Sequence, residues 1–438
     1  MWAGAPPDGP ALAQGRRKAE LILSTWAADG IDAAGLGPDD LGLDPAWITT
    51  AGQAAGVPLV VTNLSCPGLV AAPSLRVERG GKSAVVLGLW SEGTYAAGCS
   101  AAPPAAAAAA ALAADQAAHG GKAADLVIVL SQLVEDEVPA LARAVPALDL
   151  FLDGKGGPST PEPRPVSPSA LRLSSGSRGK VLGIATIRWA EGGDGLAPID
   201  AGEALDKRRA RVAQRVASAE RQVAGATDPA ARARAEERLA YLRAELERAS
   251  APVASQSGAQ SGLSLRLVGL GADIADAPGA AAALASAKAE IEAAGAAAAP
   301  TAPRAGGPYA GAAACAGCHP GPHAQWSGTP HAGAWTTLVT AQRSMDLACW
   351  GCHATGARQP GGPATPAEVG DLGGVQCEAC HGPSAAHAAD PAAHRPIRAP
   401  GVDVCVRCHD GAQDGGRFDP ATYLPKVGHG AAATPAGG

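Results

Sequence analysis

Four copies of the pentapeptide Cys-x-x-Cys-His stand in the last third of the chain and constrain it more than any other feature. They occupy residues 315–319, 349–353, 377–381 and 405–409. Two cysteines at this spacing suit thioether bonds to the two vinyl groups of one porphyrin, and the histidine that follows is placed to bind its iron. The repeat therefore predicts four haem c groups. Their attachment residues are Cys315, Cys318, Cys349, Cys352, Cys377, Cys380, Cys405 and Cys408, and their proximal iron ligands are His319, His353, His381 and His409.

Two other interpretations fit part of this pattern. Eight cysteines in Cys-x-x-Cys pairs could close two zinc sites of four thiolates each. A zinc ribbon has no need of a histidine after every second cysteine, yet all four motifs have one. A redox disulfide normally opens a helix in a βαβ context, whereas this segment is rich in Gly, Pro and Ala. Haem attachment accounts for the whole motif.

Besides the four motif histidines, the same segment contains His323, His331, His387, His394 and His429. Four irons need at most four distal ligands, so this supply is sufficient for two histidines at every iron. An iron with a histidine on both sides has no position left for substrate. The segment thus predicts bis-histidine haems.

The net charge and the remaining cysteines limit which classes of partner and which compartment are expected. The chain has 438 residues, a formal net charge of −6 and a pI of about 5.9, so neither nucleic acid nor an anionic membrane surface is an expected partner. Outside the motifs only Cys66 and Cys99 remain, both at the ends of apolar runs. In an oxidising compartment they could form a disulfide, and two buried thiols are the equal alternative.

Covalent haem attachment takes place outside the cytoplasm in bacteria, so we expect a periplasmic or extracellular protein. Residues 1–30 show no basic segment followed by an apolar one, as a signal peptide would. No run of the sequence is apolar enough for a membrane span. We therefore expect a signal or membrane anchor upstream of Met1.

Residues 1–200 alternate helix-like and strand-like segments. Val- and Leu-rich runs, of which 125–132 is continuously apolar, are typical of strands covered on both faces. Strands interleaved with helices indicate a layered α/β domain. The expected helices are 19–28, the Ala-rich run at 101–114 and 135–145. The expected strands are 57–61, 83–90, 125–132, 148–152 and 180–189.

The rest of the chain divides by composition. Residues 201–250 are rich in Arg, Glu and Ala, and apolar stripes at Val212–Val223 and Leu239–Leu246 on either side of Thr227-Asp228-Pro229 predict a helical hairpin. Residues 251–300 hold a linker, a short strand and an Ala-rich helix. Residues 301–438 form the haem domain, which makes the chain multidomain.

The α/β part, over about residues 15–200, resembles the C-terminal part of the metallophosphatase domain of the 5′-nucleotidase family. The similarity rests on the order of elements and on the runs 126–133 and 148–157. That family binds two metals through histidines and carboxylates, but the corresponding positions here read Pro38-Asp39, Gln132 and Gly154-Lys155-Gly156-Gly157. These residues cannot hold a dinuclear centre. The resemblance therefore predicts a fold without phosphatase activity, retained as a scaffold or docking module.

Residues 307–430 resemble the tetrahaem cytochrome c family of the hydroxylamine pathway in nitrifiers. The resemblance rests on Tyr309-Ala310-Gly311, Thr329-Pro330-His331-Ala332 and the run 374–383 followed by His387. It implies helices and loops wrapped round closely packed haems. It favours His331 and His387 as distal ligands, then His429 and His323, with His394 as the weakest candidate.

The sequence therefore predicts electron transfer between redox partner proteins, through four haems. The alternative is a haem-dependent oxidoreductase that acts on a small nitrogen or sulfur compound. This alternative requires one iron with an open distal position.

Overall fold

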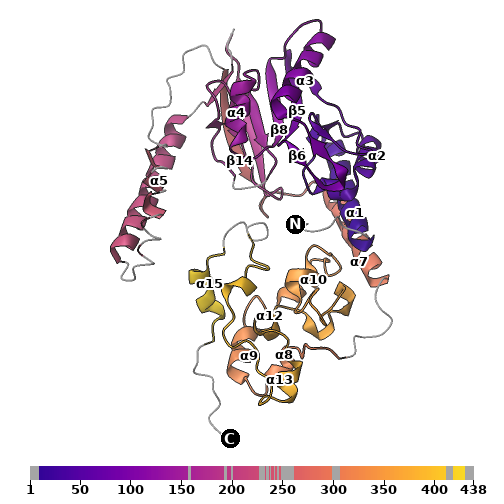
Figure 1. Ribbon diagram of the computed structural model, residues 1–438, viewed down its shortest axis with the longest axis vertical. Helices are drawn as coiled ribbons and strands as arrows, with labels where there is room; N and C mark the ends of the chain where they lie inside the picture. Colours follow the sequence, from indigo (N-terminus) through magenta and orange to yellow (C-terminus); the bar gives the residue numbers. More distant parts are fainter. Residues whose placement is uncertain are drawn as a thin grey trace. The chain divides into compact units, whose positions relative to one another are not determined.

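The computed structural model describes residues 9–155, 159–191, 195–198, 201–225, 261–297, 306–410 and 418–429, with isolated positions between 232 and 247 (Figure 1). The chain forms two compact units. One is continuous, Gly30–Ile274, and the other combines Met1–Asp29 with Ala275–Gly438. The second unit thus joins the two ends of the chain, whereas the sequence analysis grouped the N-terminal helix with the α/β domain.

A six-stranded sheet organises the continuous unit, in the order β10-β11-β9-β8-β5-β4. Its centre is parallel: β5 pairs with β8, β8 with β9, and β9 with β11. Only the edge strands β4 and β10 run antiparallel to their neighbours. The bounds are β4 Leu75–Arg79, β5 Lys82–Trp90, β8 Leu126–Gln132, β9 Leu150–Asp153, β10 Arg164–Pro165 and β11 Leu171–Leu173.

Both faces of this sheet are buried, as the continuous apolar run at 125–132 predicted. On one face, Leu87, Val129 and Phe151 are fully buried together with residues of α3 (Pro104–Ala118) and α4 (Glu137–Ala144). On the other face, Leu126, Leu150, Leu171, Leu173, Leu196 and Leu263 form a second cluster. The parallel centre of the sheet therefore carries its own aliphatic core.

Smaller elements complete the continuous unit. A three-stranded sheet pairs β12 with β14 and β14 with β13, and the predicted strand 180–189 corresponds to β12. The helix α2 precedes the short strands that lead into β4. The bounds are β1 Ala34–Gly35, α2 Pro45–Ala55, β2 Leu59–Val60, β3 Leu64–Ser65, β6 Gly93–Thr94, β7 Ser100–Ala101, β12 Val181–Arg188, β13 Leu196–Pro198 and β14 Ser261–Gly269.

Cys66 and Cys99 form a disulfide. The pairing of β3 with β7 explains why they meet, because Ser65 lies opposite Ser100 in that antiparallel ladder. The sequence left this disulfide and two buried thiols as equal alternatives.

The arm at 201–250 begins with α5, Ala201–Gly225. Val212, Val216 and Ala219 on this helix pack against Leu239 and Leu242. The two apolar stripes of the predicted hairpin thus contact one another. The predicted turn at 227–229 lies outside the described residues, as does most of the linker 251–262.

The discontinuous unit begins with α1, Gly9–Asp29, which lies beside α7, Pro278–Ala297 (Figure 1). Arg17 forms an ion pair with Glu290 on α7. Gln14 donates to the carbonyl oxygen of Met345 over 2.8 Å and accepts from the backbone N–H of Leu347 over 2.9 Å. The N-terminal helix is therefore bonded directly to the C-terminal segment.

Short helices and loops make up the rest of this unit, as predicted. A small core surrounds Trp350, which is fully buried with Leu338 and Val369 beside it. The helices are α8 Ala312–Cys315, α9 Pro320–Ser327, α10 Ala334–Thr340, α11 Trp350–His353, α12 Cys377–His381, α13 Ala385–Ala389 and α15 Pro420–Val427.

Candidate haem sites

Each pentapeptide folds as about one turn of helix. The third motif is the helix α12 itself, and the second contains α11. In the first and fourth motifs the histidine N–H donates to the carbonyl oxygen of the first cysteine, over 2.8 Å for His319 and 2.9 Å for His409. Residues three and four positions apart share one side of such a turn. Both thiols and the imidazole of a motif can therefore address the same porphyrin.

Backbone carbonyl groups orient two of the motif imidazoles. His353 Nδ1 lies 2.7 Å from the carbonyl oxygen of Ala334, and His381 Nδ1 lies 2.6 Å from that of Ile397. A hydrogen bond at Nδ1 fixes the ring and leaves Nε2 as the nitrogen that can bind a metal. These two histidines are held in the form that a proximal ligand requires.

Three motif histidines each face a second histidine from elsewhere in the segment. The ring centres are 6.3 Å apart for His319 and His387, and 5.6 Å apart for His381 and His429. The third pair, His409 and His331, has ring centres 6.1 Å apart. The structure thus brings together three of the four histidines that the resemblance favoured as distal ligands with three predicted proximal ones.

These separations fit a metal ion between the two rings. A bond from an imidazole nitrogen to a transition metal is about 2 Å long, and the ring centre lies roughly 1 Å behind that nitrogen. Two imidazoles on opposite sides of one iron therefore have their centres about 6 Å apart. The residues present fit three bis-histidine irons.

His387 is itself oriented, because its Nδ1 lies 2.8 Å from the carbonyl oxygen of His394. His394 therefore acts on this pair through its backbone. The ring of His323 lies 5.5 Å from that of Trp326, and among the described residues no motif histidine ring is paired with it.

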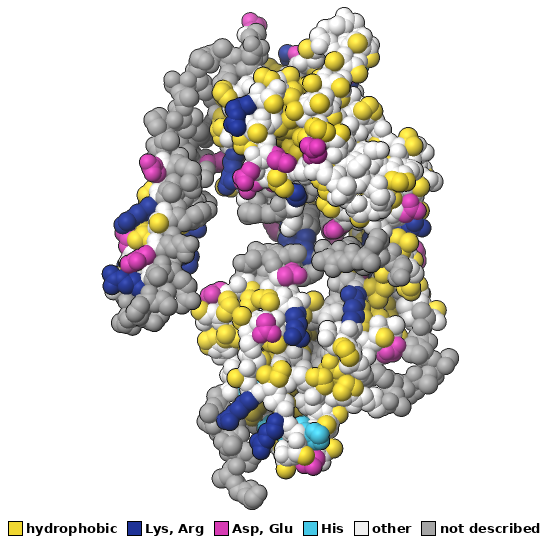
Figure 2. All heavy atoms as spheres, viewed as in Figure 1, with side chains coloured by type: hydrophobic (Ala, Val, Ile, Leu, Met, Phe, Trp, Pro, Cys, Tyr) yellow, Lys and Arg dark blue, Asp and Glu magenta, His cyan; other side chains and the backbone are white. Residues whose placement is uncertain are grey.

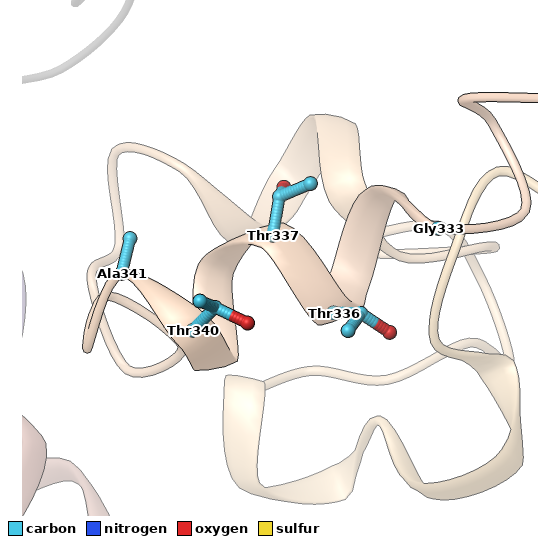
Figure 3. A pocket seen from close by; sticks show the side chains of 5 residues that line it. All are labelled: Gly333, Thr336, Thr337, Thr340 and Ala341. Carbon is cyan, nitrogen blue, oxygen red and sulfur yellow. The ribbon is translucent and has the colours of Figure 1, made fainter.

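The second motif differs from the other three. Among the described residues, no second histidine ring is paired with His353. A hollow of about 460 Å³ lies along α10, lined by Gly333, Thr336, Thr337, Thr340 and Ala341 (Figure 3). The Thr337 hydroxyl lies 3.4 Å from His353 Nδ1, so this hollow adjoins the second attachment motif.

The four motifs lie close enough for their thiols to interact. Burial, followed by the neighbouring thiol of Cys377, raises the pKa of Cys315 to about 11. A hydrogen bond with Cys352 raises the pKa of Cys408. Cys318 is exposed and the other motif thiols are half-buried, and Figure 2 shows imidazole groups at the surface of this unit. The attachment residues therefore share one small region that is open to solvent.

A buried carboxylate links the first and third motifs. Glu378, a variable position of the third motif, is 3% exposed. Its oxygens accept from the backbone N–H groups of Ala310, Gly311 and Ser384 over 2.7 to 2.9 Å. The sequence analysis missed this role, although an acidic residue between two haem-binding cysteines is the signal that could have indicated it.

A second buried carboxylate precedes the second motif. Asp346 is 3% exposed and binds Lys18 of α1 over 2.5 Å and Arg343 over 2.9 Å. Burial alone would raise its pKa, but the hydrogen bond from Lys18 and the ones from Ala348 and Arg343 lower it overall. The N-terminal helix therefore supplies a cation next to the residues that lead into Cys349.

The predicted remnants of a metallophosphatase centre lie in the continuous unit. Gln132 and Gly154 line one small pocket at the ends of β8 and β9. Gly156 and Gly157 lie outside the described residues. Within the described parts of both units, no three His, Cys, Asp or Glu side chains are grouped so as to hold a free metal ion.

Two family models match the C-terminal segment. The model "Cytochrome c554 and c-prime" matches residues 314–382, and the doubled CXXCH motif matches residues 368–414. Together they contain all four pentapeptides. The C-terminal region is thus a multihaem cytochrome c-type domain that binds haem c covalently, as the sequence predicted.

Solved structures similar to part of the chain include 5′-nucleotidases, a calcineurin-like phosphoesterase and a sulfate thiohydrolase. They include a 5′-nucleotidase precursor from Thermus thermophilus (20% identity, TM-score 0.35) and the sulfate thiohydrolase SoxB from the same organism (17%, 0.34). A third is the calcineurin-like phosphoesterase YfkN from Bacillus subtilis (16%, 0.32). The matches cover 41%, 39% and 43% of this chain, and 40%, 33% and 70% of those chains.

Two of these proteins, the 5′-nucleotidase precursor and the calcineurin-like phosphoesterase, are of the class that the α/β sequence resembles. The chain spans well under half of the first two structures. No curated protein matches the chain. In the part of the chain that the structure describes, no helix combines the length and the apolar character needed to cross a bilayer.

Proposed function

We propose that the chain is an extracytoplasmic cytochrome that transfers electrons through four covalently bound haems. The observation that carries this proposal is the set of three histidine pairs. We assign His387 as the distal ligand opposite His319, His429 opposite His381, and His331 opposite His409. Each pair has ring centres 5.6 to 6.3 Å apart.

Bound haem iron supplies one-electron exchange with redox partner proteins. The chain's part is to fill both axial positions, which excludes substrate from the iron. Its thiols from different motifs interact directly, as Cys315 does with Cys377 and Cys352 with Cys408. This proximity supports an array in which electrons pass from one haem to the next.

The second motif supports an alternative function at one site. His353 has no paired histidine among the described residues, and the hollow beside it is lined by three threonines. An iron held there by His353 alone would accept a small ligand. In that case the protein is an oxidoreductase for a small nitrogen or sulfur compound, fed by the three bis-histidine haems.

Magnetic circular dichroism of the oxidised protein, which counts low-spin and high-spin haems, tests both functions. Electron transfer predicts that at least the three paired haems are low-spin and that nitrite, hydroxylamine and cyanide leave them unchanged. A fourth haem that is high-spin and binds one of these ligands would favour the oxidoreductase. Fewer than three low-spin haems would contradict the assigned ligand pairs.

Single substitutions test the assignment itself. His331→Ala, His387→Ala and His429→Ala should each convert one low-spin haem to high-spin, because each removes one distal imidazole. His323→Ala is the matched control, since its ring contacts Trp326. It should leave the spin count unchanged.

We further propose that the α/β unit is a scaffold or docking module without phosphatase activity. Glutamine, glycine and lysine stand where such chemistry needs histidines and carboxylates. The Cys66–Cys99 disulfide supports an oxidising compartment for the whole protein. Turnover of a phosphodiester or nucleotide substrate with added manganese would contradict the assignment.

A further inference from the structure

A cavity of about 180 Å³ lies within the continuous unit, where several strands end. It is lined in part by Leu36, Trp90, Leu130, Gln132, Leu152 and Gly154. Trp90, Gln132 and Asp153 are the last residues of β5, β8 and β9, which run parallel. In open α/β sheets, ligands bind at the carboxyl ends of the parallel strands. The cavity therefore occupies the position at which this architecture offers a site.

The side-chain amide of Gln132 distinguishes this cavity from a simple packing defect. The residue is 9% exposed, and its Oε1 is buried without a hydrogen-bond partner in the structure. Its Nε2 likewise donates to no group among the residues that the structure describes. Buried side-chain amides are almost always satisfied by protein or by ordered water. An amide with both its donor and its acceptor unused indicates a place for a ligand that offers the complementary pair.

Glycine at position 154 keeps this amide where it is. A Cβ atom on Gly154 would stand 2.4 Å from Gln132 Nε2, so any side chain there would displace the amide. Trp90 on the neighbouring strand lies directly opposite Gln132 in the parallel register. Gly154 thus leaves room for the amide, and Trp90 lines the same cavity.

The carboxylate of Asp153, which lines the cavity, is already paired. Asp153 accepts from Arg172 over 2.5 Å and from the backbone N–H of Lys155 over 3.2 Å. No lysine or arginine among the described residues lines the cavity. An anionic ligand would therefore find no counter-ion there, and a cationic one would have to displace Arg172 from Asp153, so a neutral ligand is favoured.

We propose that this cavity binds a small neutral molecule that carries a carboxamide-type edge, with a donor beside an acceptor. The ligand N–H would donate to Gln132 Oε1, and its carbonyl oxygen would accept from Gln132 Nε2. A cavity of about 150 Å³ accommodates a benzene ring, so this one suits a single ring or a short chain. The site is independent of the haems, and it gives the α/β unit a function of its own.

Titration calorimetry on the haem-loaded full chain tests this site, with benzamide as the probe. Acetophenone is the matched control ligand, because it has the same ring and carbonyl but no N–H. We expect benzamide to bind at one site at least tenfold more tightly than acetophenone. Benzamide does not compete for the haem irons, so its binding should leave the haem absorption spectrum unchanged.

Two substitutions assign the binding to the amide. Gln132→Leu should weaken benzamide at least tenfold and raise the unfolding temperature of the α/β unit, because it removes an unsatisfied buried carbonyl. Gly154→Ala should weaken benzamide as well, by displacing the same amide. Gln53→Leu, at an exposed position of α2, is the control and should change neither quantity.

Equal affinity for benzamide and acetophenone, or unchanged benzamide affinity in Gln132→Leu, would overturn the proposal. So would the failure of both benzamide and the smaller acetamide to bind, which would leave water as the only occupant. Both outcomes concern the α/β unit alone. Failure of the electron-transfer proposal would instead appear in the haem spin count.

Discussion

The α/β unit and the haem segment 306–410 differ in what fills their interiors. In the α/β unit, long aliphatic side chains such as Leu87 and Val129 are fully buried on the parallel strands. In the haem segment, the α-helices are only four to eight residues long, and the hydrophobic core is the small cluster around Trp350. The same segment contains eight free cysteines. The first unit therefore has an aliphatic core of its own, whereas we expect the second to need porphyrin to fill its interior.

The largest expected effect comes from withholding haem. A chain produced in cells that cannot attach haem should lose protection from proteolysis throughout residues 306–410, while β5 and β8 stay protected. The physical reason is that short helices are marginal without tertiary packing. Limited proteolysis with mass spectrometry measures this. Equal protection of both regions would contradict the claim that only the haem segment needs haem in order to pack.

The next effect should fall on the α/β unit alone. Leu87→Ala removes a fully buried side chain from the sheet core and should cost about 3 kcal/mol of unfolding free energy. Hydrogen exchange of peptides from β5 and β8 measures it. The matched control is Leu182→Ala, whose side chain is 51% exposed, and it should change exchange little. A changed haem spectrum in Leu87→Ala would show that the two units are not independent.

A smaller effect is expected at the contact that joins α1 to the C-terminal segment. Asp346→Asn keeps the shape of a buried carboxylate but weakens its bonds to Lys18 and Arg343. Hydrogen bonds to charged groups contribute about 2 kcal/mol. The opening free energy of α1, measured by hydrogen exchange, should therefore fall by about that amount. Glu20→Gln on the exposed side of α1 is the control. Slow exchange of α1 in Asp346→Asn would mean that this contact does not hold the helix.

The smallest predicted effect is a pH dependence in the α/β unit. Hydrogen bonds from Lys82 and from the backbone of Ser83 lower the pKa of Asp125 from 3.8 to about 2. Because the folded pKa lies below the unfolded one, Asp125 stabilises the fold above pH 4, and this contribution is lost as the pH falls towards 2.

Asp125→Asn should therefore cost about 1 kcal/mol at pH 7 and less below pH 3, a modest figure because the carboxylate is partly exposed. Acid unfolding of the full chain, followed by hydrogen exchange of the peptides from β5 and β8, measures the difference. Asp136→Asn, at an exposed position, is the control. A difference that persists unchanged at pH 2 would contradict the assigned origin.

Local patterns in the sequence predicted much of this structure. The apolar run at 125–132 became β8, and the helix expected at 19–28 is the second half of α1. The partner of α1 could not be predicted, because its bonds to Asp346 and Met345 join residues more than 300 positions apart. Hydrophobic periodicity identifies a helix and its apolar side, but it does not say which surface that side covers.

The candidate site divides in the same way. The pentapeptides identified the attachment residues directly, since their chemistry depends only on local spacing. The pairing of His319 with His387, 68 positions later, depends on how the loops return and needed the structure. The buried roles of Glu378 and of the Gln132 amide also depend on long-range packing, so residue type alone did not reveal them.

The most direct test of the account is the intact mass of the full chain matured in a host that attaches haem c. The account predicts a coloured protein that is heavier than the polypeptide by the mass of four haems. A colourless product at the mass of the bare polypeptide, or one that contains zinc instead, would contradict it.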